Sequence, residues 1–245
     1  MKKLLTVAMI MASTSAMAAG GAAKWGYEGE LAAENWGTLA PEYSTCSTGQ
    51  FQSPIDINAS FSADVTDLDI KYDETAYKLT DTGHALKASF EEGNGFTAEG
   101  HNYKLLQLHF HTPSEYTIGG KQSPMVVHLV HQNEAGQLGV IGVMIDEGEA
   151  NPAIEGLWSS IPEKTGDVLQ IDEALDLQAL LPADRSFYRF MGSLTTPPCS
   201  EGVNWFFMKN SITASKEQIA AHVAKWKHNA RPLQKKGHRL IIDAK

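Results

Sequence analysis

The chain has few cysteines, few basic residues and no apolar run long enough to cross a membrane. Lys and Arg number 20 against 29 Asp and Glu, so the formal net charge is −9. This acidic balance argues against nucleic acid and against an anionic membrane surface as partners. The basic stretch at 225–239, KWKHNARPLQKKGHR, is therefore expected to be a solvated face near the C-terminus.

The first 18 residues, MKKLLTVAMIMASTSAMA, combine two lysines, an apolar stretch and a small-residue segment that ends at Ala18. These are the three parts of a secretory signal peptide, and the apolar stretch is too short for a membrane span. We therefore predict a signal peptide at 1–18 and an exported, soluble chain that begins near Ala19. Loss of Lys2 and Lys3 would take the net charge from −9 to −11.

Two cysteines, Cys46 and Cys199, remain after the predicted cleavage. An even number of cysteines in an exported protein predicts one disulfide, with two buried free thiols as the alternative. A bridge between them would close a long loop and so remove much conformational entropy from the unfolded chain. It would also anchor the segment around Cys199.

The rest of the sequence indicates a single, mainly β domain at 19–245. It contains no internal repeat, low-complexity tract or Pro/Ser-rich linker. Two helices are expected: 151–162, with Ile154, Leu157, Trp158 and Ile161 on one face, and a second after the Ser215–Gln218 capping box, in which His222 is a packed residue and no ligand. Alternating or β-branched apolar runs predict the strands, at 67–73, 84–91, 96–111, 124–133, 138–145 and 202–209.

The segment 105–116, LLQLHFHTPSEY, places two histidines one residue apart in a predicted strand. Alternation puts Leu106, Leu108 and Phe110 on one face of this strand. Gln107, His109 and His111 then share the other face. A solvated polar face would explain this pattern equally well, so the interpretation depends on a third histidine elsewhere.

That histidine is His128, which shares a strand face with Val126 and Val130. An imidazole between two valines is poorly solvated and needs a hydrogen-bond partner or a metal. Together with His109 and His111 it would supply three neutral nitrogen ligands. Three histidines and one open position are typical of a catalytic zinc site, in which bound water reaches a pKa of about 7.

Four motifs, QSPIDI, QLHFHTPSEY, HLVH and GSLTTPPCSEGVNW, resemble the α-class carbonic anhydrases of the bacterial periplasmic branch. The resemblance extends from Trp25 to the C-terminus. It implies one domain on a large, mostly antiparallel twisted sheet with a few short helices. It also implies a periplasmic enzyme that uses Zn²⁺ to interconvert carbon dioxide and bicarbonate, and that sulfonamides and anions inhibit.

The same resemblance assigns roles to individual residues. His109, His111 and His128 match the zinc ligands, and Gln107 matches the hydrogen-bond partner of the first. Thr195 matches the threonine that accepts the nucleophile's proton, and Glu115 the carboxylate that receives the threonine's own proton. The positions that match the substrate pocket are Val130, Val140, Leu194, Thr196, Val203 and Trp205.

His84, in DTGHALK, matches the proton shuttle of the family. An imidazole with a pKa near 6.5 is suited to carry a proton to buffer. Without the resemblance, a surface histidine after a turn glycine is an equal interpretation.

One position departs from the family pattern. Two residues before the third histidine the family has glutamate, whose carboxylate accepts the outer ring N–H, whereas this chain has Val126. Valine accepts no hydrogen bond, and loss of such a partner costs about 10–100-fold in metal affinity or activity. This departure raises one rival function, a related binding protein with impaired or lost catalysis. A second rival, independent of Val126, is a different zinc hydrolase that acts on activated esters at a similar site.

Overall fold

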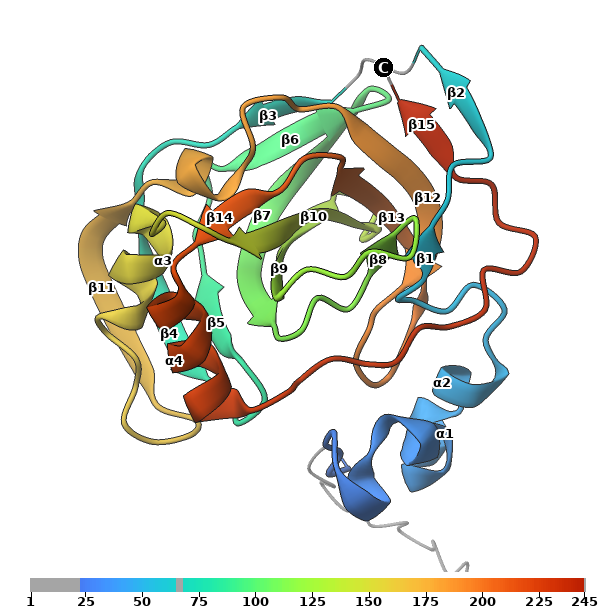
Figure 1. The fold of residues 1–245 in the computed structure, drawn as a ribbon, viewed down its shortest axis with the longest axis horizontal. Helices are drawn as coiled ribbons and strands as arrows, with labels where there is room; N and C mark the ends of the chain where they lie inside the picture. Colours follow the sequence, from blue (N-terminus) through green and yellow to red (C-terminus); the bar gives the residue numbers. More distant parts are fainter. Residues whose placement is uncertain (1–22, 65–67, 245) are drawn as a thin grey trace, which may run out of the picture.

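The computed structural model describes residues 23–64 and 68–244, so the signal-peptide prediction at 1–18 lies outside the described residues. Fifteen strands and four α-helices occur in these ranges (Figure 1). None of the helices in this part of the chain is long and apolar enough to cross a membrane. The helices are α1 (Trp36–Leu39), α2 (Thr45–Thr48), α3 (Pro152–Trp158) and α4 (Lys216–Trp226). The strands are β1 (Asp56–Ile57), β2 (Phe61–Ala63), β3 (Asp69–Lys71), β4 (Thr75–Asp81), β5 (Leu86–Ser89), β6 (Gly95–Ala98), β7 (His101–His111), β8 (Thr117–Ile118), β9 (Met125–Asn133), β10 (Leu138–Glu147), β11 (Val168–Leu175), β12 (Phe187–Ser193), β13 (Glu201–Met208), β14 (Ile212–Ala214) and β15 (Ile242–Ala244).

One large twisted sheet holds most of these strands, as the sequence predicted. Its main path runs β11-β4-β5-β7-β9-β10-β13-β12-β15-β2. Most neighbours are antiparallel, but β10 and β13, in the middle of the path, are parallel, as are β15 and β2 at one end. The longest strands, β7, β9 and β10, therefore lie side by side in the interior of the sheet (Figure 1).

The two faces of the sheet carry different clusters of buried side chains. Met125, Val127 and Leu129 of β9 join the larger cluster, which also contains residues of α3 and α4. Val126 and Val130 point to the opposite face and join a second cluster with residues of β10 and β13. The alternation predicted for β9 is thus correct, because its two faces are buried against different partners.

The capping box predicted for α4 is present. The Ser215 hydroxyl accepts from the Gln218 N–H at 3.2 Å, and the Gln218 side chain accepts from the Ser215 N–H at 3.1 Å. The other helix is shorter than predicted, because α3 ends at Trp158 and leaves Ile161 outside it. Pro162 gives the reason, since the residue before a proline is disfavoured in helical conformation.

The segment predicted as one strand at 96–111 is a hairpin of β6 and β7. Glu99 and Gly100 form its two-residue turn, and both have positive φ, as a tight hairpin requires. The predicted inward position of Leu106 is wrong: its side chain is 39% exposed, whereas Leu105 is buried. A register shift against β9 between Leu105 and Gln107 makes Leu106 the extra residue of a bulge.

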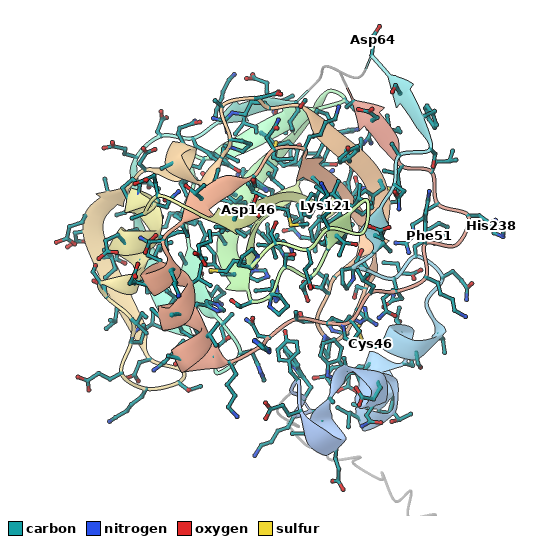
Figure 2. The ribbon with its side chains drawn as sticks, viewed as in Figure 1. Cys46, Phe51, Asp64, Lys121, Asp146 and His238 are labelled. Carbon is teal, nitrogen blue, oxygen red and sulfur yellow. A yellow bond between two sulfur atoms is a disulfide. The ribbon has the colours of Figure 1, made fainter. Side chains whose placement is uncertain are left out.

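Cys46 and Cys199 form the predicted disulfide, which joins residues 153 positions apart. Cys46 belongs to α2, in the small helical part that precedes the sheet (Figure 2). Both cysteines pack with Trp36 and Tyr43 in a third buried cluster. The disulfide therefore fastens this N-terminal part to the loop that follows β12.

The C-terminal segment at 225–239 differs from the expected solvated face. Asn229, Arg231 and Arg239 are all buried, although the lysines between them are exposed or half-buried. The Arg231 guanidinium donates to the carbonyls of Ser53 and Cys46 at 2.7 and 2.8 Å. The segment is thus partly interior, because its arginines satisfy backbone carbonyls that the sheet does not use.

Candidate metal and catalytic centre

Three histidines meet where β7 and β9 pair. His109 lies opposite His128 in the ladder, and His111 lies one pleat further along β7. The candidate ligand nitrogens of the three side chains all lie within 4.8 Å of one another. The bulge at Leu106 precedes this point, so Gln107, His109 and His111 still share one face of the strand.

In each of the two histidines of β7, the ring nitrogen that points away from the cluster, here called the outer nitrogen, makes a hydrogen bond that orients the ring. His109 Nδ1 donates to Gln107 Oε1 at 2.8 Å, and His111 Nδ1 donates to the Asn229 carbonyl at 2.7 Å. These bonds place a proton on each Nδ1 and leave each Nε2 as the candidate ligand atom. The His111 Nε2 atom is buried and has no hydrogen-bond partner in the part of the chain that the structure describes.

His128 directs Nδ1 toward the cluster, whereas the two histidines of β7 direct Nε2 toward it. Its Nδ1 lies 3.8 Å from Glu115 Oε2, which in turn lies 3.4 Å from His111 Nε2, so both nitrogens converge beside the same carboxylate. Its outer Nε2 is buried without a hydrogen-bond partner among the described residues. Val126, on the same face of β9, offers no acceptor.

The donor set fits a metal ion. Burial lowers the pKa of His109 and of His128 well below the ordinary value, so both rings are neutral and able to ligate. Three imidazole nitrogens, with no fourth protein ligand beside them in residues 23–64 and 68–244, are typical of an open, catalytic site. An imidazole nitrogen such as His111 Nε2, buried without a partner, is otherwise costly.

Glu115 and Thr195 lie beside this cluster. Burial raises the pKa of the Glu115 carboxyl, against the opposing effects of His111, of a hydrogen bond from the Thr195 side chain and of the Arg231 N–H. The Arg231 N–H donates to Glu115 Oε1 at 2.9 Å. Because the Thr195 hydroxyl donates to Glu115, its oxygen is left as an acceptor.

A hollow of about 210 Å³ leads to the histidines. Its lining includes Gln107, His109, His111 and Thr196 together with His84 at the rim. The other positions expected in the substrate pocket belong to one apolar cluster on this face of the sheet: Val130, Val140, Leu194, Val203 and Trp205. The Trp205 ring lies 4.9 Å from the His128 ring, between centroids, so this apolar cluster extends to the three histidines.

His84 lies in a tight turn directly before β5. Its ring stacks on Trp25, with centroids 3.9 Å apart and planes 16° from parallel. Burial lowers the pKa of His84, and the negative charge of Asp81 opposes this effect. The imidazole is half-buried in the lining of the hollow and still reaches solvent.

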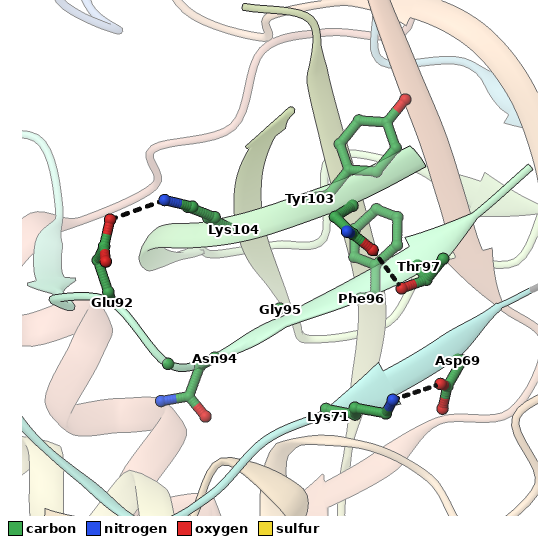
Figure 3. Close-up of a pocket in the computed structure, with 11 residues that line it drawn as sticks. Asp69, Lys71, Glu92, Asn94, Gly95, Phe96, Thr97, Tyr103 and Lys104 are labelled. Carbon is green, nitrogen blue, oxygen red and sulfur yellow. Dashed lines mark hydrogen bonds and ion pairs between the residues drawn. The ribbon is translucent and has the colours of Figure 1, made fainter. Parts of the chain in front are cut away.

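A second hollow, of about 260 Å³, lies on β3, β6 and β7 away from the histidines (Figure 3). Phe96 and Tyr103 stack beside it, and two ion pairs line it, Lys71 with Asp69 and Lys104 with Glu92. These charges neutralise each other in pairs and are well exposed. The chemistry of the chain therefore concentrates at the histidine cluster.

Two residues at the site were not recognised in the sequence. Asn229 orients His111, and the Arg231 N–H holds Glu115, yet both partners lie more than 110 residues away along the chain. Both contacts use backbone atoms, which any residue possesses. No side-chain pattern in NAR at 229–231 predicts them.

Comparison with known proteins shows the family. The model of the eukaryotic-type carbonic anhydrases matches residues 31–245, and the chain belongs to this family. A carbonic anhydrase of Pectobacterium carotovorum is 38% identical over 99% of this chain and 100% of its own, and one of Klebsiella pneumoniae is 41% identical over 91% and 92%. The α-carbonic anhydrase of Thermovibrio ammonificans, solved in complex with the inhibitor sulfanilamide, superposes with a TM-score of 0.87 at 38% identity, over 91% of this chain and 100% of that one.

Proposed function

We propose that this protein is an exported, zinc-dependent enzyme that reversibly hydrates carbon dioxide to bicarbonate and a proton. One observation supports this most strongly: a cluster of three histidines lies beside the Glu115–Thr195 pair, where a hollow on one side and a buried apolar cluster on the other meet it. A zinc ion at His109, His111 and His128 would supply the Lewis acidity that makes a water nucleophilic near neutral pH.

The chain's own residues would orient and protect this reaction. The Thr195 hydroxyl donates to Glu115 and can therefore only accept from the nucleophile, so the nucleophile's lone pair points toward the substrate. The apolar wall of Val130, Val140 and Trp205, with Leu194, Thr196 and Val203, suits neutral carbon dioxide. Charged bicarbonate suits the same wall less, which favours its release.

His84 would carry the released proton to buffer. Each hydration of one carbon dioxide by one water yields bicarbonate and one proton, which must leave before the next turnover. The half-buried imidazole at the rim of the hollow is placed to take it. Its stack on Trp25 holds the ring at the rim, where bulk buffer reaches it.

The remaining expectations follow from the same assignment. We propose that residues 1–18 are a signal peptide, that 19–245 form the mature periplasmic domain, and that aromatic sulfonamides and small anions inhibit it. The relative solved with sulfanilamide supports the inhibitor class. An acidic chain with −9 net charge supports a small-molecule substrate and no nucleic acid or membrane partner.

Metal analysis of the purified protein together with stopped-flow carbon dioxide hydration tests this function. We expect one zinc per chain, and a sharp loss of zinc at neutral pH in His109→Ala, His111→Ala and His128→Ala. His131→Ala is the matched control, because His131 is also a buried histidine of β9 but faces the opposite cluster, near Phe96. Zinc at full stoichiometry in His128→Ala would refute the ligand set, and a zinc-loaded wild type without hydration activity would indicate a binding protein instead.

A further inference from the structure

Asn229 uses every one of its polar groups at the site. Its backbone N–H donates to the Thr112 carbonyl at 3.0 Å, and its backbone carbonyl accepts from His111. Its Oδ1 accepts from the Thr112 N–H at 2.8 Å. Its Nδ2 donates to two carbonyls, those of His84 at 2.9 Å and Phe110 at 3.0 Å. The side chain is fully buried, so water replaces none of these bonds.

The backbone and the side chain of Asn229 contact different residues of the site. The carbonyl that orients His111 belongs to the backbone and would remain with any residue at this position. The contact with His84 belongs to the amide alone. Of the uncharged side chains, only the amides of Asn and Gln offer two donors and an acceptor. The amide thus joins the end of the metal-binding strand to the turn that carries His84.

The turn itself is fastened locally. Asp81 Oδ1 accepts from the Gly83 N–H at 2.8 Å, and the Thr82 hydroxyl accepts from the Ala85 N–H at 3.0 Å. The ladder between β5 and β7 is in register from Lys87, opposite His109. His84 lies before this ladder begins. The Asn229 amide connects the backbone of His84 to β7, because it donates to the carbonyls of both His84 and Phe110.

We propose that Asn229 is a positioning residue for proton transfer: its side-chain amide sets where the His84 imidazole lies relative to the three histidines. The inference rests on the proposed function, in which His84 accepts the proton. Transfer between a donor and an acceptor depends steeply on their separation and orientation, so a turn that drifts would slow this step while leaving the chemistry at the histidines intact.

Asn229→Ala removes the amide and keeps the backbone contact with His111. Asn151→Ala is the matched control, because Asn151 is a buried asparagine whose side chain binds three backbone groups, those of Ala153, Ile154 and Ala179, none of which belongs to the site. In dilute buffer we expect Asn229→Ala to lose about 10-fold in kcat, with recovery on addition of imidazole, while kcat/KM and zinc affinity stay within about threefold of wild type. Asn151→Ala should change none of these ratios.

A second measurement does not depend on activity. In the zinc-free protein the Trp25 ring current shifts the NMR resonance of the His84 ring, because the two rings are stacked. We expect this resonance to move toward its value in a free histidine in Asn229→Ala and to stay in place in Asn151→Ala. If Asn229→Ala does not fold, scalar couplings across hydrogen bonds in the wild type decide instead: coupling from Asn229 Nδ2 to the His84 carbonyl carbon is expected, and its absence overturns the proposal.

The outcomes separate this proposal from the proposed function. Equal kcat in dilute buffer and equal His84 shifts in the two variants would overturn the positioning role. A parallel loss of kcat/KM and zinc affinity in Asn229→Ala would also overturn it, since Asn229 would then act through His111. A wild type that does not hydrate carbon dioxide would refute the proposed function, whereas the His84 resonance would still report whether Asn229 places the ring.

Discussion

At the scale of single residues, the outer nitrogen of His128 distinguishes this site. His109 and His111 each donate their outer N–H to an oxygen, of a side-chain amide and a backbone carbonyl respectively. The corresponding atom of His128 is buried among Val126 and its apolar neighbours and has no partner in the described chain. A buried, unpaired donor costs about 1–3 kcal/mol, and the same loss weakens a metal ligand by lowering its basicity.

Val126→Glu should supply the missing acceptor. Val126 shares a face of β9 with His128 and lies opposite His111 in the ladder, so a carboxylate there is within the same layer of side chains. A charge-assisted hydrogen bond is stronger than a neutral one. We expect zinc affinity and hydration rate to rise about 10–100-fold, measured by chelator competition and stopped-flow hydration.

Two further variants control for size and charge at this position. Val126→Gln offers a neutral acceptor and should give a smaller gain, and Val126→Leu fills the space without an acceptor and should give none. Without metal, Val126→Glu should be no more stable than wild type, because its carboxylate is then buried without full compensation. Equal zinc affinity and turnover in wild type and Val126→Glu would mean that the unpaired nitrogen has no functional cost.

His84→Ala tests the shuttle directly. If the imidazole carries the proton, the variant should hydrate carbon dioxide more slowly in weak buffer and recover in part when imidazole is added, since a free imidazole replaces the missing ring. Hydration should be followed at several buffer concentrations at fixed pH. An unchanged rate in weak buffer would leave His84 as an ordinary histidine at the rim.

At the scale of elements, the sequence predicted the parts of the site whose neighbours lie close along the chain. Strand alternation placed Gln107, His109 and His111 on one face, and the pairing of β7 with β9 brings His128 to them. It failed at Leu106, because the alternation changes phase at two adjacent leucines, 105 and 106, and only the pairing with β9 shows which of them is the extra residue of the bulge. It also gave no sign of α1 and α2, since single turns are too short to show a helical period.

The contacts from the C-terminal segment show a second reason why part of the site could not be predicted from the sequence. His111 and Glu115 each bond to a backbone atom of this segment, the Asn229 carbonyl and the Arg231 N–H respectively, so these two contacts require no particular residue type. The basic composition of 225–239 predicted solvent exposure, but both arginines are buried and donate to backbone carbonyls. Only the three-dimensional arrangement identifies which charges are interior.

The disulfide joins two elements that no hydrogen-bonded ladder connects. Cys199 lies four residues beyond Thr195, and Gln52 Nε2 donates to the Cys199 carbonyl at 3.0 Å in the same interior. Replacement of both cysteines by serine should lower stability by about 2–5 kcal/mol, because it frees a long loop in the unfolded chain. It should also loosen the Thr195 loop, seen as faster hydrogen exchange from residue 194 to 199.

Asn35→Ala is a suitable control, because Asn35 lies in the same N-terminal part and its side chain binds only exposed carbonyls there. It should leave hydrogen exchange in the Thr195 loop unchanged. Thiol labelling of denatured, unreduced protein should find no free cysteine. Two free thiols in the exported protein would contradict the bridge.

At the scale of the whole molecule, the interior histidines make stability depend on pH. Burial lowers the pKa of His131 and of His222 to about 3 each, and each ring is hydrogen-bonded to one hydroxyl, of Tyr72 and Thr112 respectively. The unfolded chain binds a proton at each of these rings below about pH 6.5, and the folded chain binds it only near pH 3. The zinc-free protein should therefore lose stability as the pH falls through this window, by about 1.4 kcal/mol per pH unit for each histidine.

Denaturant unfolding of the zinc-free protein between pH 4 and 6 checks this slope. His131→Gln should show a dependence on pH shallower than that of wild type by about 1.4 kcal/mol per unit, because one of the rings is gone. Leu129→Ala, a buried change in the same strand, should lower the free energy of unfolding equally at each pH. Parallel curves for wild type and His131→Gln would show that this ring does not contribute.

The position of β15 bears on how the chain assembles. Ile242–Ala244 lie between β12 and β2, so Phe61 pairs with a residue 181 positions further along the sequence. During translation, β2 can pair with β15 only after nearly the whole chain has been synthesised. Glu115 likewise gains its hydrogen bond from the Arg231 N–H only late in synthesis. Closure over such separations is slow, and the unfinished sheet leaves strand edges unpaired. An interrupted chain that stops before residue 229 would therefore contain all three histidines. It would still lack the Asn229 carbonyl that orients His111 and the Arg231 N–H that donates to Glu115.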